Sequence, residues 1–138
     1  MKHCFILVFF FSTLLYSRTL EHIRWHWDYD RALIEAKQKH KPIMLFLQKK
    51  NSKESKKMLF TTLCNQSYIK DINQKYISIV LFFEEKNLYP SELFYPESLP
   101  AVFFIDSKNE SLLINPIFGY MPPDQFRILL ENLNKKKI

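Results

Sequence analysis

The sequence offers little material for a membrane span. The apolar run near its start, Phe5 to Phe11, is well short of the roughly 20 residues that a membrane-spanning helix needs. A basic start, an apolar core of this length and a small residue at Ser17 are instead the pattern of a secretory signal peptide. We therefore expect residues 1–17 to direct export to the periplasm or otherwise out of the cytoplasm. An uncleaved anchor is the alternative, because Leu15 and Ser17 make a mediocre cleavage site.

Cysteine is also scarce: the chain has two, Cys4 and Cys64. Removal of residues 1–17 takes Cys4 away, and an exported chain with one thiol can form no internal disulfide. Its core must be stable without such links. The remaining thiol of Cys64 is either buried and inert or available to a partner.

The positive charge has no pattern typical of nucleic-acid binding. The formal net charge is +6, but the lysines are spread over predicted loops, helix faces and the C-terminal tail. We therefore expect no nucleic-acid partner. The 138 residues, 47% of them hydrophobic, suit one core, and we expect residues 18–138 to form a single domain.

The apolar pattern predicts alternating strands and helices. Strands are expected at 43–47, 76–83, 101–105 and 112–118, with a weakly indicated edge strand at 20–27. Helices are expected from the N-cap Asp28 to about His40, from Ser52 until the pattern falters at Thr61 and Thr62, from the N-cap Asn65 to just before Tyr76, and from Pro122 onward. Residues 84–98 read as a loop with one helical turn near Glu92 and Phe94.

This order predicts an α/β fold. Two strands joined by a helical crossover are most simply parallel, and the last two strands, separated by a short turn, are most simply an antiparallel hairpin. The expected architecture is a mixed central sheet of about four to five strands with helices on both faces. Gly119, the single glycine, follows the last strand, where a positive φ is often required.

An ordered set of residues between about 25 and 133 resembles the thioredoxin-like superfamily, in particular its exported bacterial members. The set comprises Trp27 followed by Ala32 and Ala36, Lys41-Pro42 before the first core strand, Lys56 and Met58 after a helix start, Leu99-Pro100 before a strand ending at Asp106, Gly119-Tyr120, and a last helix with Phe126 and Leu130. The resemblance implies a thioredoxin-like fold.

Members of this family carry Cys-x-x-Cys-Lys-x-Met at the start of that helix, and the segment here is Ser52-Lys53-Glu54-Ser55-Lys56-Lys57-Met58. The resemblance therefore implies that serines occupy both cysteine positions. It also implies that Pro100 is a cis-proline whose loop sits against the helix start and, in active relatives, helps to hold a substrate's extended backbone. Leu99 departs from the threonine, valine or serine that is more usual before this proline.

Serine at these positions changes the chemistry. Thiol–disulfide exchange needs a thiolate, which a helix N-terminus favours, but the same partial charge cannot ionise a hydroxyl near neutral pH. We expect Ser52 to cap the helix and Ser55 to be a small polar residue in its first turn. The sequence thus predicts no catalytic residue with assurance and no cofactor, and enzyme activity is uncertain.

We expect a non-catalytic module that binds a peptide or protein of the cell envelope in a groove formed by Ser52, Lys53, Glu54, Ser55, Leu99 and Pro100. The alternative is a thiol–disulfide oxidoreductase or redox adaptor that acts through Cys64. A third hypothesis is a structural subunit tethered to the membrane by an uncleaved segment 1–17.

Cys64 follows Ser55 by nine residues, about 13 Å along a continuous helix and on its opposite face. If the helix breaks at Thr61 and Thr62, Cys64 would lie just before a second helix N-terminus, which could activate it modestly. We interpret it as a buried small residue or, alternatively, as a thiol with some reactivity.

Two further groups of side chains could bind an ion or could be ordinary surface residues. His22 and His26 are four residues apart, but in a strand they lie too far apart to share one ion easily, and we expect no metal site. Five lysines surround the predicted turn from the strand 43–47 to the helix that starts at Ser52, which we call the corner: Lys49, Lys50, Lys53, Lys56 and Lys57. They suit either a solvated surface or a site for an anion or acidic partner.

Overall fold

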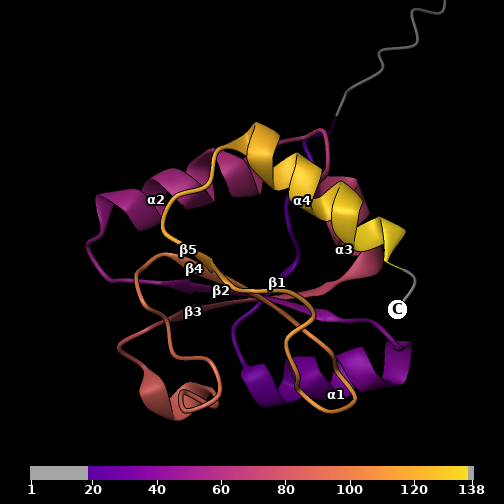
Figure 1. The fold of residues 1–138 in the computed structure, drawn as a ribbon, viewed down its shortest axis with the longest axis vertical. Helices are drawn as coiled ribbons and strands as arrows, with labels where there is room; N and C mark the ends of the chain where they lie inside the picture. The colour runs from indigo at the N-terminus through magenta and orange to yellow at the C-terminus, as the bar shows by residue number, and fades with distance from the viewer. Residues whose placement is uncertain (1–18, 137–138) are drawn as a thin grey trace, which may run out of the picture.

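The computed structural model describes residues 19–136, which form alternating strands and helices around one sheet (Figure 1). The strands are β1 (Trp25–His26), β2 (Ile43–Gln48), β3 (Ile77–Phe82), β4 (Ala101–Ile105) and β5 (Ile117–Phe118). The α-helices are α1 (Tyr29–Lys39), α2 (Lys53–Phe60), α3 (Ile69–Lys75) and α4 (Pro123–Lys135), and two short 3-10 helices are η1 (Thr62–Cys64) and η2 (Lys86–Leu88).

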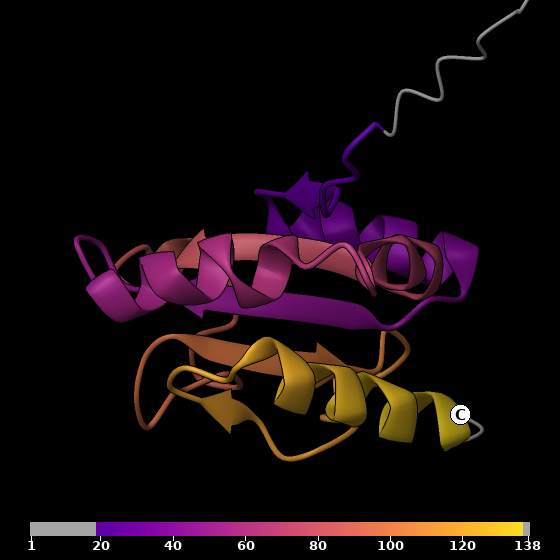
Figure 2. The same ribbon diagram turned by 90° about the horizontal axis from the view of Figure 1, so that it is seen from above.

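The sheet has five strands in the order β1-β3-β2-β4-β5 (Figure 2). The pairs β1–β3 and β2–β3 are parallel, whereas β2–β4 and β4–β5 are antiparallel. The predicted mixed sheet, with its parallel crossover and its antiparallel last pair, is confirmed.

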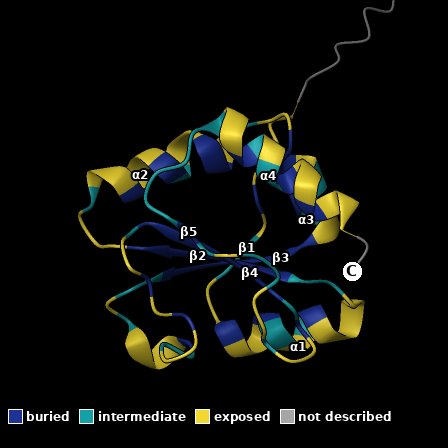
Figure 3. Cartoon of the chain, viewed as in Figure 1, coloured by how far each residue is buried: buried dark blue, intermediate teal, exposed yellow. Residues whose placement is uncertain are grey.

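The two faces of the sheet are covered by different helices. In Figure 1, α2, α3 and α4 lie on one side of the sheet, and α1 and the segment around η2 lie on the other. Side chains of β2 alternate between them: Met44 and Phe46 join the core under α2, α3 and α4, and Leu45 and Leu47 join the core against α1. Because both faces are covered, β2 is buried along its whole length, as the dark ribbon of the sheet shows in Figure 3.

Polar residues begin and end the first two helices where the sequence predicts. The Asp28 side chain accepts a hydrogen bond from the Arg31 N–H at the start of α1, and His40 ends that helix with φ 53°, in the left-handed conformation. Ser52 caps α2 in the same way as Asp28 caps α1. On α1, Tyr29, Ala32 and Ala36 are buried, whereas Ile34 is exposed.

The short elements differ from the prediction. Asn65 does not cap α3, because its side chain accepts from the Ser67 N–H and hydroxyl, and α3 begins after Tyr68 without a side-chain cap. The loop contains the 3-10 helix η2, which was not predicted, and the predicted turn near Glu92 and Phe94 is present, because the Leu93 and Phe94 N–H groups both donate to the Pro90 carbonyl.

The last predicted strand, 112–118, is wrong over most of its length. Only Ile117 and Phe118 pair with β4 as a strand, and Leu112 makes a single bridge to Ile105. Residues 113 and 114 instead pack against the core as an irregular segment.

No helix within residues 19–136 is long and apolar enough to cross a bilayer. The predicted signal peptide or anchor, residues 1–17, lies outside the described residues.

Candidate functional site

The corner between β2 and α2 is held by the hydroxyl groups of two serines. Ser52 Oγ accepts a hydrogen bond from the Ser55 N–H at 3.2 Å, and Ser55 Oγ accepts one from the Lys49 N–H at 3.1 Å. Ser55 is buried, with 1% of its surface exposed, whereas Ser52 is half-buried. The two hydroxyls therefore close the loop onto the helix, as the prediction of a cap at Ser52 requires.

Strand pairing brings Pro100 to the same end of the sheet as this corner. Leu47, near the end of β2, pairs with Ala101 at the start of β4, so the residue before β4 lies beside the exit of β2. The Leu99–Pro100 peptide bond is cis. The Pro100 carbonyl accepts a hydrogen bond from the Gly119 N–H at 2.7 Å, and Gly119 has φ +79°, a conformation that side chains disfavour.

The segment after Gly119 ties this end of the sheet to α2. The Met121 N–H donates to Met58 Sδ at 3.4 Å, and the Thr62 hydroxyl donates to the Met121 carbonyl at 2.6 Å. The Tyr120 hydroxyl lies 3.2 Å from Thr61 Oγ1. Tyr120 and Met121 therefore hold the segment after Gly119 against α2 and η1; the resemblance includes Tyr120, whereas no sequence signal indicated Met121.

The lysines around the corner are exposed, but they differ in whether they contact other side chains. The Lys50 N–H donates to Glu84, its Nζ lies 3.7 Å from Glu85, and the Lys57 Nζ lies 4.3 Å from the Tyr120 ring centre. Lys53 and Lys56 make no ion pair with the described residues. The corner therefore presents positive charge to solvent beside Ser52.

Neither serine is arranged as a nucleophile. A serine needs an adjacent base to attack a substrate, and the hydrogen bonds of Ser52 and Ser55 within the described residues go to backbone N–H groups. Glu54, the neighbouring carboxylate, is exposed and makes no hydrogen bond with the described residues. Among the described residues, this arrangement supplies no activated hydroxyl.

Cys64 lies at the other end of α2, and its interpretation as a buried residue is wrong. Its side chain is exposed, and its thiol donates a hydrogen bond to the Leu59 carbonyl at 3.1 Å. The chain does break at Thr61, as one alternative required, but η1 follows and α3 begins only at Ile69. Cys64 therefore does not lie at the N-terminus of the second helix.

An apolar hollow of about 310 Å³ opens beside Cys64, between β1, the end of α2 and η1. We call it the thiol pocket. It is lined by His22, Ile23, Trp25, Trp27, Gln48, Leu59, Phe60, Leu63, Cys64 and Val80. The sequence analysis missed this pocket; the signal that could have indicated it is Gln48, the polar last residue of an otherwise apolar strand.

Tyr68 contacts η1 from the buried core. Its hydroxyl donates to the Thr62 carbonyl in the buried interior, and its ring packs 5.5 Å from that of Phe126. Burial raises the pKa of Tyr68, an effect that Arg127 partly opposes. A neutral Tyr68 thus holds the 3-10 helix that carries Cys64.

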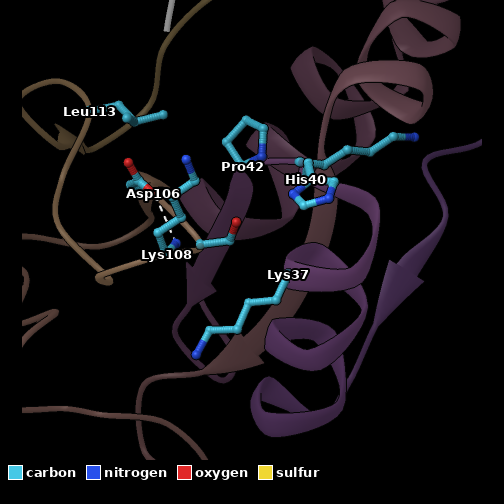
Figure 4. Close-up of a pocket in the computed structure, with 8 residues that line it drawn as sticks. Lys37, His40, Pro42, Asp106, Lys108 and Leu113 are labelled. Atoms are coloured by element: carbon cyan, nitrogen blue, oxygen red, sulfur yellow. Dashed lines mark hydrogen bonds between the residues drawn. The ribbon is translucent and has the colours of Figure 1, made fainter.

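A hollow of about 680 Å³ lies at the end of the sheet opposite the corner, where Ile43 pairs with Ile105 (Figure 4). It is lined by Lys37, His40, Lys41, Pro42, Asp106, Ser107, Lys108 and Leu113. The Lys37 side chain extends away from Asp106 and Leu113 in Figure 4. Charges of both signs surround this hollow, and they do not converge on one point.

The two histidines considered as metal ligands contact different parts of the protein. His26 Nε2 is 2.9 Å from a Glu35 carboxylate oxygen, whereas His22 lines the thiol pocket. Within residues 19–136, no three histidine, cysteine, aspartate or glutamate side chains are grouped to hold a metal ion.

Comparison with known proteins identifies the fold. The family profile described as a thioredoxin-like domain matches residues 29–134. A comparison with curated proteins found no match.

Solved structures with the same fold include a DsbH oxidoreductase, with a TM-score of 0.69 and 19% identity over 85% of this chain and 88% of that one. A thioredoxin from Thermus thermophilus has a TM-score of 0.67 and 15% identity, covering 83% of this chain and 87% of its own. The reduced C-terminal domain of Neisseria meningitidis DsbD has a TM-score of 0.57 and 20% identity, covering 75% of this chain and 91% of its own. At these identities the likeness shows the fold.

Proposed function

Because the chain belongs to the thioredoxin-like domain family, we propose that it is an exported, non-catalytic module that binds a peptide or protein of the cell envelope. The proposed binding groove lies between Ser52 and Pro100 and includes Lys53, Glu54, Ser55 and Leu99. Residues 1–17 serve as the export signal in this proposal.

One observation carries the proposal. The hydroxyls of Ser52 and Ser55 accept backbone hydrogen bonds at the start of α2, and the resemblance implies that redox-active members of the family place two cysteines there. The helix start and Pro100 are retained at one end of the sheet, but no sulfur is present at this corner. A frame that holds an extended backbone without exchanging disulfides suits a binding module.

The test is site-specific photo-crosslinking in the native host. A photoreactive amino acid at Lys53, exposed beside the groove, should cross-link to an envelope protein in the presence and absence of reductant. The same group at Ile128, exposed on α4, is the matched control and should give no such product. Equal products from both positions, or a product from Lys53 that reductant abolishes, would contradict the proposal.

An activity assay tests the second part of the proposal, that the protein is not catalytic. The purified exported protein should reduce insulin disulfides no faster than its Cys64→Ala variant. A rate well above that of the variant would show that the protein is a thiol-dependent enzyme.

A redox adaptor acting through Cys64 is the second candidate, favoured by the exposure of that thiol. One of the similar structures is named an oxidoreductase, which supports this role only by analogy of fold. The test is alkylation of the native protein with iodoacetamide. We expect Cys64 to be labelled without denaturant; labelling only after denaturation would exclude the adaptor.

A further inference from the structure

The thiol pocket is lined by a largely buried glutamine whose amide makes no hydrogen bond with the described residues. This residue, Gln48, is 8% exposed. Met44 and Phe46, two and four residues earlier on β2, point to the face covered by α2, and Gln48 lines the thiol pocket on that face. The Gln48 amide is therefore accessible from the hollow, where a water or a ligand can supply the hydrogen bonds that the described residues do not.

Apart from Gln48, Cys64 and His22, the lining of the thiol pocket is apolar, and the pocket lies open at its rim. Trp25, Leu59, Leu63 and Val80 are among its apolar lining residues. Trp27 and Phe60, which also line it, are each 69% exposed. Exposed large apolar side chains around a hollow are typical of a surface that binds an apolar group.

The exposed Cys64 thiol lines the same hollow as Gln48. Lysine, arginine, aspartate and glutamate are absent from the described lining. A ligand that uses all three features therefore has a reactive sulfur, an apolar group and a neutral amide close together. An amide both donates and accepts hydrogen bonds, so it can pair with the Gln48 carboxamide.

We propose that the thiol pocket is a covalent capture site for a neutral disulfide that carries an apolar group and an amide next to its sulfur. The apolar group enters the pocket, the amide pairs with Gln48, and the sulfur bonds to Cys64. This inference rests on the second function proposed above and is independent of the groove between Ser52 and Pro100.

The chemical step is thiol–disulfide exchange. Cys64 loses its proton to solvent, and its thiolate attacks one sulfur of the ligand disulfide. The ligand's S–S bond breaks as the new bond to Cys64 Sγ forms, and the other half of the ligand leaves as a thiolate that takes up a proton. One thiol and one disulfide enter and leave, so no further oxidant is needed.

The test compares the rates at which Cys64 reacts with two probes. One is the symmetrical disulfide of N-acetyl-phenylalanyl-cysteine amide, and the other is its alanyl analogue, which differs by the phenyl ring. Mass spectrometry of the adduct follows each rate. We expect the phenylalanyl probe to react about tenfold faster with the native protein, because its ring becomes buried. In urea the two rates should be equal.

Variants assign the preference to the pocket. Phe60→Ala and Trp27→Ala remove exposed side chains, so they should preserve the fold while reducing the preference several-fold. Gln48→Leu should slow both probes, since both carry the amide, but it should not slow 2,2′-dithiodipyridine, which has none. Ile128→Ala, away from the pocket, should change nothing. Circular dichroism checks the fold of each variant.

The possible outcomes distinguish ligand selection by the thiol pocket from disulfide exchange through Cys64. Equal rates for both dipeptide probes in the native protein would overturn the pocket inference and leave exchange through Cys64 intact. Reaction of the unfolded chain but not the native protein with either probe would overturn both. A preference that persists in urea, or that survives Phe60→Ala and Trp27→Ala unchanged, would also overturn the inference, as would a Gln48→Leu variant that reacts with both dipeptide probes as fast as the native protein.

Discussion

The two ends of α2 differ in what their polar groups do. At the start, Ser52 and Ser55 accept backbone hydrogen bonds and close the corner. Beyond the end, Cys64 is exposed and Gln48 has no side-chain partner among the described residues. The hydroxyls at the helix start therefore hold the local structure, whereas the Cys64 thiol in η1 and the Gln48 amide on β2 line a hollow beyond the helix end.

The largest expected effect comes from introducing two cysteines at the start of α2, which would reverse the difference between its two ends. Ser52→Cys with Ser55→Cys, made in a Cys64→Ala background, should raise insulin-disulfide reduction at least about tenfold, because the helix N-terminus favours a thiolate. The assay is the rate of insulin precipitation with a dithiol reductant. Ser52→Cys alone is the control, and a folded double variant no faster than this control would show that the corner does not position a dithiol.

A second change removes a structural hydrogen bond from the corner. Ser55→Ala leaves the Lys49 N–H without its acceptor and should lower the free energy of unfolding by about 1–2 kcal/mol. Urea denaturation measures the loss. Ser91→Ala, whose hydroxyl makes no hydrogen bond with the described residues, should cost less than half as much; equal losses would mean that the Ser55 hydroxyl is not structural.

A third change acts at the other end of α2. Tyr68→Phe removes the donor to the Thr62 carbonyl and should lower the free energy of unfolding by about 1 kcal/mol. Urea denaturation near neutral pH measures this difference. Tyr95→Phe, at an exposed position, is the control and should have almost no effect.

The same tyrosine predicts a pH dependence. Burial raises the pKa of Tyr68, so above about pH 10 the unfolded chain loses a proton that the folded protein retains. Stability should therefore be complete below pH 10 and fall as the pH rises beyond it. Denaturation midpoints between pH 9 and 11 should fall less steeply in Tyr68→Phe; parallel curves would contradict the assignment.

The smallest effect sharpens the role of Ser52. Ser52→Asp should change the free energy of unfolding by only a few tenths of a kcal/mol, because aspartate is also a good N-cap and its charge suits a helix N-terminus. Ser52→Ala should lose about 1 kcal/mol in the same urea experiment. If aspartate costs as much as alanine, the Ser52 hydroxyl does more than cap the helix.

Local signals predicted most of the frame. The continuous apolar runs in β2, β3 and β4 need burial on both faces, so their positions followed from the sequence. Weak or short elements were harder to predict. Asn65 has the right chemistry for a cap, but its side chain accepts hydrogen bonds from Ser67 instead. Leu113 and Ile114 are apolar enough for a strand, but they pack against the core without extending β5.

The sequence indicated residues of the proposed groove but not of the thiol pocket. Ser52 and Pro100 could be named from the sequence and the resemblance. Gln48 and Trp27 could not be assigned to one pocket, because Gln48 comes from β2 and Trp27 follows β1, and β3 lies between these strands. Only their packing under α2 and η1 makes them neighbours of Cys64.

The sequence by itself determined the order of the central elements, the cap at Ser52 and the absence of cysteine from the start of α2, because caps and apolar periodicity act over a few residues. The tertiary structure decided the strand order and the exposure of Cys64. It also decided which side chains share a pocket with Gln48. These depend on contacts between segments far apart in the chain, which no local pattern encodes.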